Sequence, residues 1–406
     1  MPDHGTTAAQ ALLSDASPID ERAIRAFRLA RVRERLVADD IAAIVLWDPI
    51  NIRYATGSRN MQVWTMHAWC RYAFVPAEGP VVLFDLGSSA HLSAGLETID
   101  EIRFGLSPDF MISGPRAAEM SDRWAAEIAD LLQSVGGGRL AFDRSDIMMI
   151  RALDRLGVDS IDGKGVMERA RAVKSREEIR AFKRSLEACE GAVTDMRAAL
   201  RPGMTEQQAL GHLMKGIIDR GGEYPETRLL TSGPRTNPWF QETADRVMRE
   251  GDLLSFDTDL IGPYGFYTDI SRSWTVGEVM PTDDQRRLYD LSRRQVAHNM
   301  ALLRPGLAFL DYSDKCFQLP DIYVENRYAD VAHGCGLAVE YPLIWYKEDH
   351  EWGAYDGMFE ENMIVCLESY VGAKGGHEGV KLEQPVWITA DGPVLLSDYP
   401  LEDAYA

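Results

Sequence analysis

The sequence predicts a mixed α/β protein made of two large domains. In the first 170 residues, apolar runs typical of buried strands (41–47, 72–76, 80–85 and 140–143) alternate with helical patterns (20–38 and 117–134). Strands that alternate with helices indicate an α/β domain, which we expect over residues 20–170. Residues 171–406 combine long helices with strands that carry carboxylates, and they indicate a second domain with an α+β arrangement.

Capping boxes mark the start of this second domain. Ser175 and Glu178 frame the first box, and Thr205 and Gln208 frame the second. In a capping box, the two side chains satisfy free backbone N–H groups at the start of a helix, so each pair predicts a helix that begins there. The polar residues 1–19, which precede the first predicted helix, are expected to form a flexible lead or an arm that packs on another subunit.

The composition excludes several classes of protein. A hydrophobic fraction of 46% in 406 residues is enough for large cores, whereas a formal net charge of −20 argues against binding to nucleic acid. No apolar run reaches membrane-spanning length and the N-terminus lacks the pattern of a secretion signal, so we expect a cytoplasmic protein. The five cysteines form no CxxC pair, which argues against a disulfide framework, and Cys335 is expected to be a packing residue.

Three aspartates lie close together in an otherwise apolar stretch. Asp257 and Asp259 are separated by one residue, so both side chains leave the same face of an extended strand. Gly262 and Pro263 then turn the chain, and Asp269 returns on a partner strand. Two like charges about 4 Å apart repel by roughly 4 kcal/mol at an effective dielectric of about 20. Such a cluster needs protons, basic partners or a metal ion.

Three later residues complete a candidate metal site. His333 lies in a His-Gly-Cys-Gly-Leu motif, and Glu368 and Glu383 are both embedded in apolar strands. Five carboxylates and one imidazole suit two divalent ions such as Fe, Mn, Co or Zn better than a structural zinc held by thiolates. The alternative is that these acids are separate strand ends on a solvated rim.

The order of these six residues resembles that of the pita-bread metallopeptidase superfamily, which includes methionine aminopeptidase, aminopeptidase P, prolidase and creatinase. The motif Asn51-Ile-Arg-Tyr-Ala-Thr-Gly57 in the first domain is part of the resemblance. It implies a creatinase-like N-terminal domain and a C-terminal pita-bread domain with pseudo-twofold halves. Related halves would explain why Leu-Arg-Pro-Gly ends two long helices, at 200–203 and 303–306. A homodimer is also implied.

Within the superfamily, three long segments are similar to the dimethylsulfoniopropionate lyase branch: 226–242, 256–262 and 269–274. Two peptidase histidines are absent, since Trp239 replaces one and Glu340 lies in the region of the other. In the lyase branch all six ligands have counterparts here, but the aspartate that acts as base corresponds to Val339. Candidates for another base are Glu340, Tyr328 and a metal-bound hydroxide, although an extended strand would point Glu340 away from the face of Val339.

The resemblance therefore favours β-elimination on a small betaine or onium-type carboxylate whose carboxylate binds the metals. Trp239 and Trp64 are candidates to face the cationic group, because cations sit favourably over indole rings. Arg228 is a candidate to bind the carboxylate. The alternative is a metal-dependent hydrolase, either an X-Pro aminopeptidase or dipeptidase or a small-amide hydrolase. It would use a metal-bridging hydroxide, with Glu368 as general acid and base.

Overall fold

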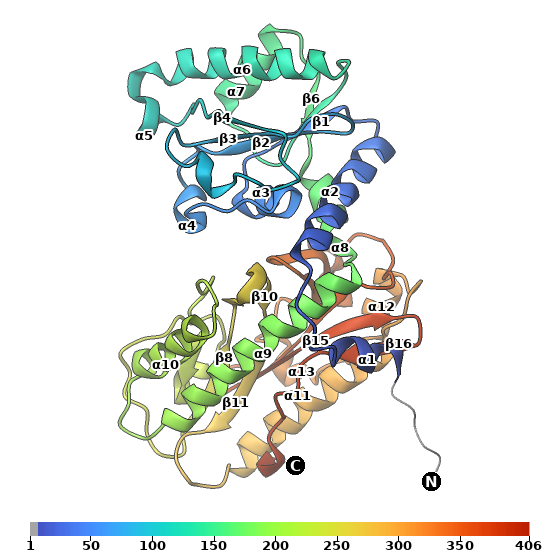
Figure 1. Ribbon diagram of the computed structural model, residues 1–406. Helices are drawn as coiled ribbons and strands as arrows, with labels where there is room; N and C mark the ends of the chain where they lie inside the picture. The colour runs from blue at the N-terminus through green and yellow to red at the C-terminus, as the bar shows by residue number, and fades with distance from the viewer. Residues whose placement is uncertain (1–6, 406) are drawn as a thin grey trace. The chain divides into compact units, whose positions relative to one another are not determined.

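A computed structural model describes residues 7–405 of the chain. They form two compact units, one of residues 20–171 and one of residues 172–405 together with 7–19. Figure 1 shows the helices and strands of both units. Among the described residues, no helix is long and apolar enough to cross a membrane.

The unit of residues 20–171 is built on one six-stranded sheet, in the order β4-β3-β2-β1-β5-β6. Its strands are β1 (Ala43–Leu46), β2 (Tyr72–Pro76), β3 (Val82–Asp85), β4 (Glu101–Phe104), β5 (Leu140–Phe142) and β6 (Ser160–Asp162). Its helices are α2 (Glu21–Ala38), α3 (Pro49–Thr56), α4 (Gln62–Thr65), α5 (Phe110–Ser113), α6 (Ala117–Ser134), α7 (Ile147–Arg155) and α8 (Lys164–Ala172). Figure 1 shows α6 and α7 over one face of the sheet and α3 and α4 at the other. The predicted alternation of strands and helices is confirmed.

A buried carboxylate fixes the start of α3 in this unit. Asp143, which follows β5, accepts hydrogen bonds from the backbone N–H of Trp47 (2.8 Å) and of Asp48 (3.1 Å) and from the amide of Asn51 (3.0 Å). Asn51 in turn accepts a bond of 2.7 Å from Arg171. The Asn51 motif lies at the start of helix α3, directly after strand β1. Backbone N–H groups at the start of a helix need acceptors, and Asp143 supplies them here.

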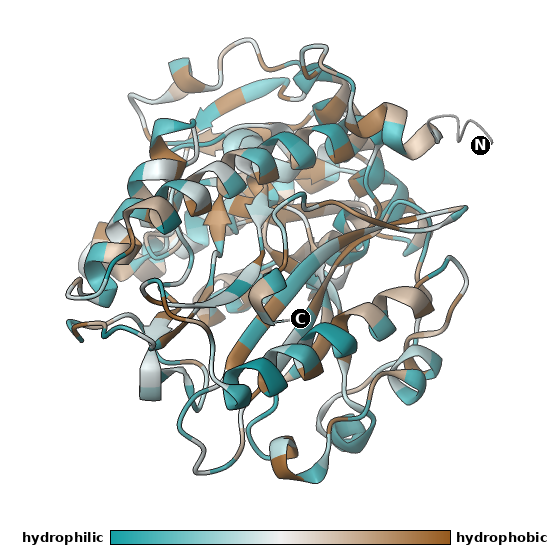
Figure 2. Cartoon of the chain, turned by 90° about the horizontal axis from the view of Figure 1, so that it is seen from below, coloured by the Kyte–Doolittle hydropathy of each residue, from teal (hydrophilic) through white to brown (hydrophobic). Residues whose placement is uncertain are grey.

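The second unit contains three sheets and three long helices. The helices are α9 (Arg176–Ala199), α10 (Glu206–Asp219) and α11 (Asp283–Leu302), with the shorter α1 (Ala8–Leu13), α12 (Phe309–Lys315) and α13 (Asp321–Val324). Both predicted capping boxes are present, and Thr282 and Gln285 form a third at the start of α11. Figure 2 shows hydrophilic and hydrophobic residues alternating along the helices, as expected where one helix face covers a core.

The strands of this unit form sheets in the orders β11-β8-β7, β10-β9 and β13-β12-β14-β15-β16. Their bounds are β7 (Leu230–Ser232), β8 (Leu253–Asp257), β9 (Leu260–Ile261), β10 (Tyr267–Thr268), β11 (Ser271–Thr275), β12 (Asp330–Cys335), β13 (Val339–Trp345), β14 (Ile364–Val371), β15 (Val380–Thr389) and β16 (Gly392–Leu395). Hydrogen bonds between Ser273 and the backbone of Lys381, at 3.0 and 3.1 Å, join β11 to β15. The aspartate strands thus meet the strands that carry Glu368 and Glu383.

The two Leu-Arg-Pro-Gly sequences have the same conformation. Leu200 caps α9 with φ −66° and ψ 130°, and Leu303 caps α11 with φ −64° and ψ 130°. Gly203 then donates a backbone hydrogen bond of 2.9 Å to Met248, and Gly306 donates one of 2.8 Å to Phe359. Both glycines have positive φ, at 90° and 78°, which favours glycine over other residues. The two helix exits are therefore structurally equivalent, as expected for the pseudo-twofold halves that the resemblance implied.

Of the predicted N-terminal arm, residues 1–6 lie outside the described residues, and the rest is partly structured. Residues 8–13 form α1, and the chain that follows is tied to α9. Arg180 donates hydrogen bonds to the backbone oxygen of Ser17 at 2.7 Å and to its hydroxyl at 2.6 Å, and Arg184 donates to the oxygen of Asp15 at 2.9 Å. Composition alone could not reveal these anchors, because they lie on a helix more than 160 residues away.

Candidate metal site

One face of the five-stranded sheet carries three of the six predicted ligands. Glu368 on β14 lies directly opposite Glu383 on β15, and residues in register on antiparallel strands point to the same face. His333 on β12 lies opposite Cys366 on β14, two residues before Glu368 and therefore on the same face again. All four side chains are buried.

The aspartate hairpin supplies the other three ligands, but not from one regular strand. Asp257 is the last residue of β8, and Asp259 follows with φ 44°, a left-handed conformation that ends the strand. The expectation of one extended strand through both aspartates is therefore wrong, although the two carboxylates still lie in the same cluster with Asp269. Asp259 accepts hydrogen bonds from the hydroxyls of Tyr267 and Thr227.

The six side chains meet at one buried site. The side chains form three overlapping groups, and within each group the possible ligand atoms lie within 4.8 Å of one another. The first group is Asp269, His333, Cys366 and Glu383, the second is Asp257, Asp259 and Asp269, and the third is Asp257, Glu368 and Glu383. The structure thus brings together all of the residues predicted to hold metal. The alternative of separate acids on a solvated rim is contradicted, because each of these residues is buried.

The distances around His333 fit a metal ion better than hydrogen bonds. Its Nε2 lies 3.6 Å from Asp269 Oδ2, 3.5 Å from Glu368 Oε1 and 3.6 Å from Glu383 Oε1. Ligands about 2.1 Å from a tetrahedral ion are about 3.4 Å apart, close to these values. Asp269 Oδ1, Glu368 Oε1 and Glu383 Oε1 are buried without a hydrogen-bond partner among the described residues. Unpartnered buried oxygens are costly, and a bound cation would satisfy them.

The pKa values indicate the same need for cations. Burial, followed by the charges of Glu383 and Asp257, raises the pKa of Asp269 well above its usual value. Burial and the charge of Asp257 raise the pKa of Asp259 to about 8. Without a metal, these carboxyl groups therefore tend to keep their protons at neutral pH. A divalent ion reverses this tendency because it stabilises the ionised form.

Lys381 is part of the site, and the sequence prediction missed it. Its Nζ lies 3.0 Å from Asp257 Oδ2, 2.6 Å from Glu368 Oε2 and 3.1 Å from Glu383 Oε2, and it is fully buried. Burial alone would lower the pKa of Lys381, but these three carboxylates raise it well above the usual value. The sequence did contain one indication of this position. Lys381 is two residues before Glu383, so the two side chains leave the same face of strand β15.

Aromatic side chains border this ammonium. Lys381 Nζ lies 4.5 Å from the ring centre of Tyr328 and 5.9 Å from that of Trp239. Phe240 packs on Tyr328 with ring centres 5.1 Å apart and is 56% exposed. Trp239 is buried, and its indole N–H has no hydrogen-bond partner in the part of the chain that the structure describes. Two of the predicted residues, Trp239 and Tyr328, therefore lie beside the ligand set.

Three other predicted residues have different surroundings. Glu340 forms a buried ion pair with Lys174, and Gly336 makes room for its carboxylate, since a Cβ there would lie 2.3 Å from Glu340 Oε1. Arg228 is exposed and pairs with Glu242 at 2.6 Å. Trp64 belongs to α4 in the other unit and is 41% exposed. The roles of these three residues remain predictions.

The fold and the site define a class, that of metal-dependent enzymes with a carboxylate-rich site in a pita-bread domain. Residues 180–390 match the model of metallopeptidase family M24, and residues 28–173 match that of the creatinase/prolidase N-terminal domain. The chain therefore belongs to metallopeptidase family M24. The resemblance to the pita-bread superfamily is confirmed, and the family depends on a pair of metal ions.

Among curated proteins, the chain is similar to the dimethylsulfoniopropionate lyase DddP of Roseovarius nubinhibens, with 38% identity over 392 residues, 95% of this chain and 88% of the lyase. It is 26% identical to the probable dipeptidase PepE of Mycobacterium tuberculosis over 279 residues, 66% of this chain and 71% of that protein. Among solved structures, the dipeptidase PepE from Mycobacterium ulcerans has a TM-score of 0.74 and 22% identity, covering 95% of this chain and 98% of its own. The likeness to this solved structure shows the fold alone.

Proposed function

We propose that this protein is a metal-dependent lyase that carries out β-elimination on a small onium-type carboxylate, with dimethylsulfoniopropionate as the first substrate to test. The observation that carries the proposal is the complete six-ligand set in a chain that is 38% identical to a dimethylsulfoniopropionate lyase over 95% of its length. Two divalent ions among Fe, Mn, Co and Zn suit this mixture of carboxylates and one imidazole.

The aromatic residues beside the site support a substrate with a cationic group. An ammonium already lies over the rings of Tyr328 and Trp239, so a cation is stable in this environment. The free indole N–H of Trp239 is a donor that a substrate carboxylate would satisfy. In the proposal, Trp239, Tyr328 and Phe240 surround the onium group and orient it.

The elimination removes a proton from the carbon next to the carboxylate. The electron pair of that C–H bond forms the new double bond, and the bond to the onium sulfur breaks, which releases a neutral dialkyl sulfide and an unsaturated carboxylate. When bound, the metal ions draw electron density from the substrate carboxylate and so acidify this carbon. We assign the proton to Glu368, whose carboxylate is fully buried in the site and is held by Lys381 at its Oε2.

Glu340 is less suited to this role. Its carboxylate is bound to Lys174, and strand β13 alternates between an exposed Val339, at 42%, and a buried Glu340. Adjacent residues of a strand point to opposite faces, so Glu340 does not take the place of a base at position 339.

A hydrolase is the second candidate, and Val339 favours it. Valine cannot accept a proton, whereas the six ligands are also sufficient for attack by water on a carbonyl group. In that case Glu368 would act as general acid and base, on an X-Pro peptide or a small amide.

Incubation of the metal-loaded protein with dimethylsulfoniopropionate and with Gly-Pro and Ala-Pro separates the two functions. We expect release of dimethyl sulfide and no free amine; amine release without sulfide above a blank lacking enzyme would establish the hydrolase instead. Glu368→Gln should lower sulfide release by at least about 100-fold, while Glu340→Gln should change it less than about tenfold. The opposite pattern would assign the base to Glu340.

The predicted homodimer remains a prediction, and light scattering of the protein in solution would test it by giving the molecular mass.

A further inference from the structure

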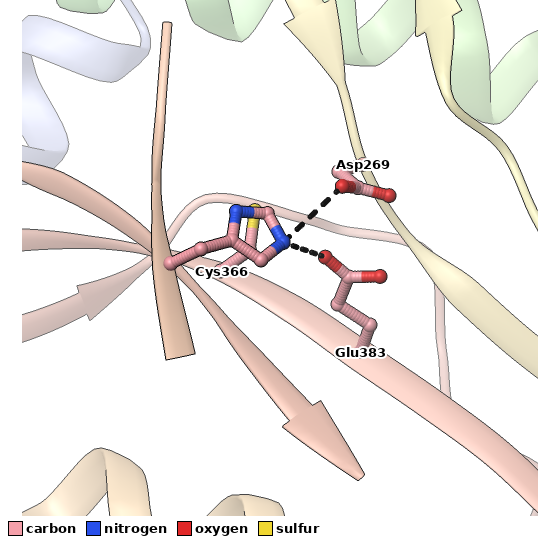
Figure 3. A group of neighbouring side chains, drawn as sticks. Asp269, Cys366 and Glu383 are labelled. Atoms are coloured by element: carbon pink, nitrogen blue, oxygen red, sulfur yellow. Dashed lines mark ion pairs between the residues drawn. The ribbon is translucent and has the colours of Figure 1, made fainter. Parts of the chain in front are cut away.

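Cys366 lies within the candidate metal site. Its side chain is opposite His333 in the register of β12 and β14, and it lies two residues before Glu368 on the same face. The sulfur, an imidazole nitrogen of His333 and carboxylate oxygens of Asp269 and Glu383 all lie within 4.8 Å of one another. Figure 3 shows Cys366 with the carboxylates of Asp269 and Glu383.

This group is somewhat wider than a closed coordination sphere. With a thiolate bond of about 2.3 Å and an oxygen bond of about 2.1 Å, neighbouring ligands of a tetrahedral ion are about 3.6 Å apart. The four atoms lie within 4.8 Å of one another, so side-chain movements of about 1 Å would bring them around one ion. Asp269 Oδ1 and Glu383 Oε1 give independent evidence for a cation, because both are fully buried and have no hydrogen-bond partner among residues 7–405.

We propose that Cys366 is a ligand of the metal ion that His333 binds, so that the two metal positions differ in chemistry. This inference rests on the proposed metal-dependent function and adds a ligand to it. The position at His333 would have sulfur, nitrogen and oxygen donors, whereas the position at Asp257, Asp259 and Asp269 has oxygen donors only. The thiol loses its proton to solvent when it binds the ion.

The mixed donor set predicts which metal each position prefers. Thiolate and imidazole favour borderline ions such as Zn²⁺, Co²⁺ and Fe²⁺, and sites made of carboxylates alone suit Mn²⁺ and Mg²⁺. The site is therefore expected to fill its two positions with different affinities, and Zn²⁺ binds first beside His333.

Cys335 provides a matched control in the same strand as His333. It is buried like Cys366, but its Sγ donates a hydrogen bond of 3.3 Å to the backbone oxygen of Tyr267. Among the described residues, Cys335 belongs to none of the groups that could hold a metal. Replacement of either cysteine by serine changes one sulfur to oxygen at nearly constant volume.

X-ray absorption of the zinc-loaded, fully reduced protein tests the proposal without any assay of activity. With one Zn²⁺ per chain, we expect a sulfur neighbour at about 2.3 Å in the wild type and in Cys335→Ser, and only nitrogen and oxygen neighbours at about 2.0–2.2 Å in Cys366→Ser. The cobalt-loaded wild type should show a thiolate-to-cobalt charge-transfer band that Cys366→Ser lacks. Cys366→Ser should also lower the Zn²⁺ affinity at least about tenfold.

Bound zinc without a sulfur neighbour in the wild type would overturn the inference and leave the proposed function untouched. A sulfur neighbour that persists in Cys366→Ser and disappears in Cys335→Ser would also overturn it. A wild type that binds no divalent metal at all would instead refute the proposed function. Circular dichroism spectra and melting temperatures of both variants verify that they are folded.

Discussion

Replacement of Lys381 by methionine tests how the buried carboxylates are neutralised. The change keeps the apolar length of the side chain but removes an ammonium that contacts Asp257, Glu368 and Glu383 at 2.6–3.1 Å. Removal of one partner of a buried ion pair leaves an uncompensated charge and costs about 3–5 kcal/mol. For a unit of this size, that loss corresponds to a fall in melting temperature of about 6–20 °C in the metal-free protein.

Divalent ions should reduce this loss, because they neutralise the same carboxylates. We therefore expect Lys381→Met to lower the melting temperature much less when the protein is saturated with metal, as measured by calorimetry at constant pH. Lys174→Met is the matched control: it breaks the buried ion pair with Glu340, which lies outside the ligand set, and its cost should be equal with and without metal. A cost of Lys381→Met below about 1 kcal/mol, or one that metal leaves unchanged, would refute the reasoning.

Three further predictions concern the ligands, the missing base and the N-terminal unit. Asp269 belongs to two of the three candidate ligand groups, so Asp269→Asn should remove most of the bound metal; unchanged stoichiometry by elemental analysis would contradict the ligand assignment. Val339→Asp restores a carboxylate at the base position of the lyase branch; because Glu368 is the assigned base, sulfide release should rise less than about tenfold, and a rise of about 100-fold or more would assign the base to position 339 instead. Burial raises the pKa of Asp143 from 3.8 to about 6, so its stabilising contribution is complete below about pH 4 and is lost as the pH rises through 6. The unfolding free energy of the wild type should therefore fall by about 3 kcal/mol relative to that of Asp143→Asn between pH 4 and 7 in urea titrations, and parallel pH profiles would contradict the shift.

The sequence was sufficient for the fold and for the choice of candidate ligands because both depend on local patterns. Strand and helix periodicity predicted the α/β unit, and capping boxes located the starts of α9 and α10. The candidate ligands stood out because a carboxylate or imidazole in an apolar strand is costly unless a cation compensates it. The Leu-Arg-Pro-Gly repeat also carried correct information, since both copies have the same backbone geometry.

Lys381, Cys366 and Phe240 were missed because their places beside the ligand set depend on strand register or on contacts between distant segments. Which residues of β12, β14 and β15 face one another is decided by strand pairing, and a shift of one residue would turn Lys381 and Cys366 to the other face. The contact of Phe240 with Tyr328 joins segments almost 90 residues apart, so no local pattern indicated it. The conformation of Asp259 was missed for another reason, because a positive φ at a residue other than glycine is uncommon.

The charges of the assembled site relate its metals to its substrate. Five buried carboxylates and one ammonium leave four negative charges when His333 is neutral, which two divalent ions would cancel. One ion would leave an uncompensated charge of −2 in a buried site, which is costly, so the charge count favours two ions. A thiolate at Cys366 would add one negative charge. That charge lies in the site bordered by Trp239 and Tyr328, and it would favour a substrate with a cationic group over a neutral peptide.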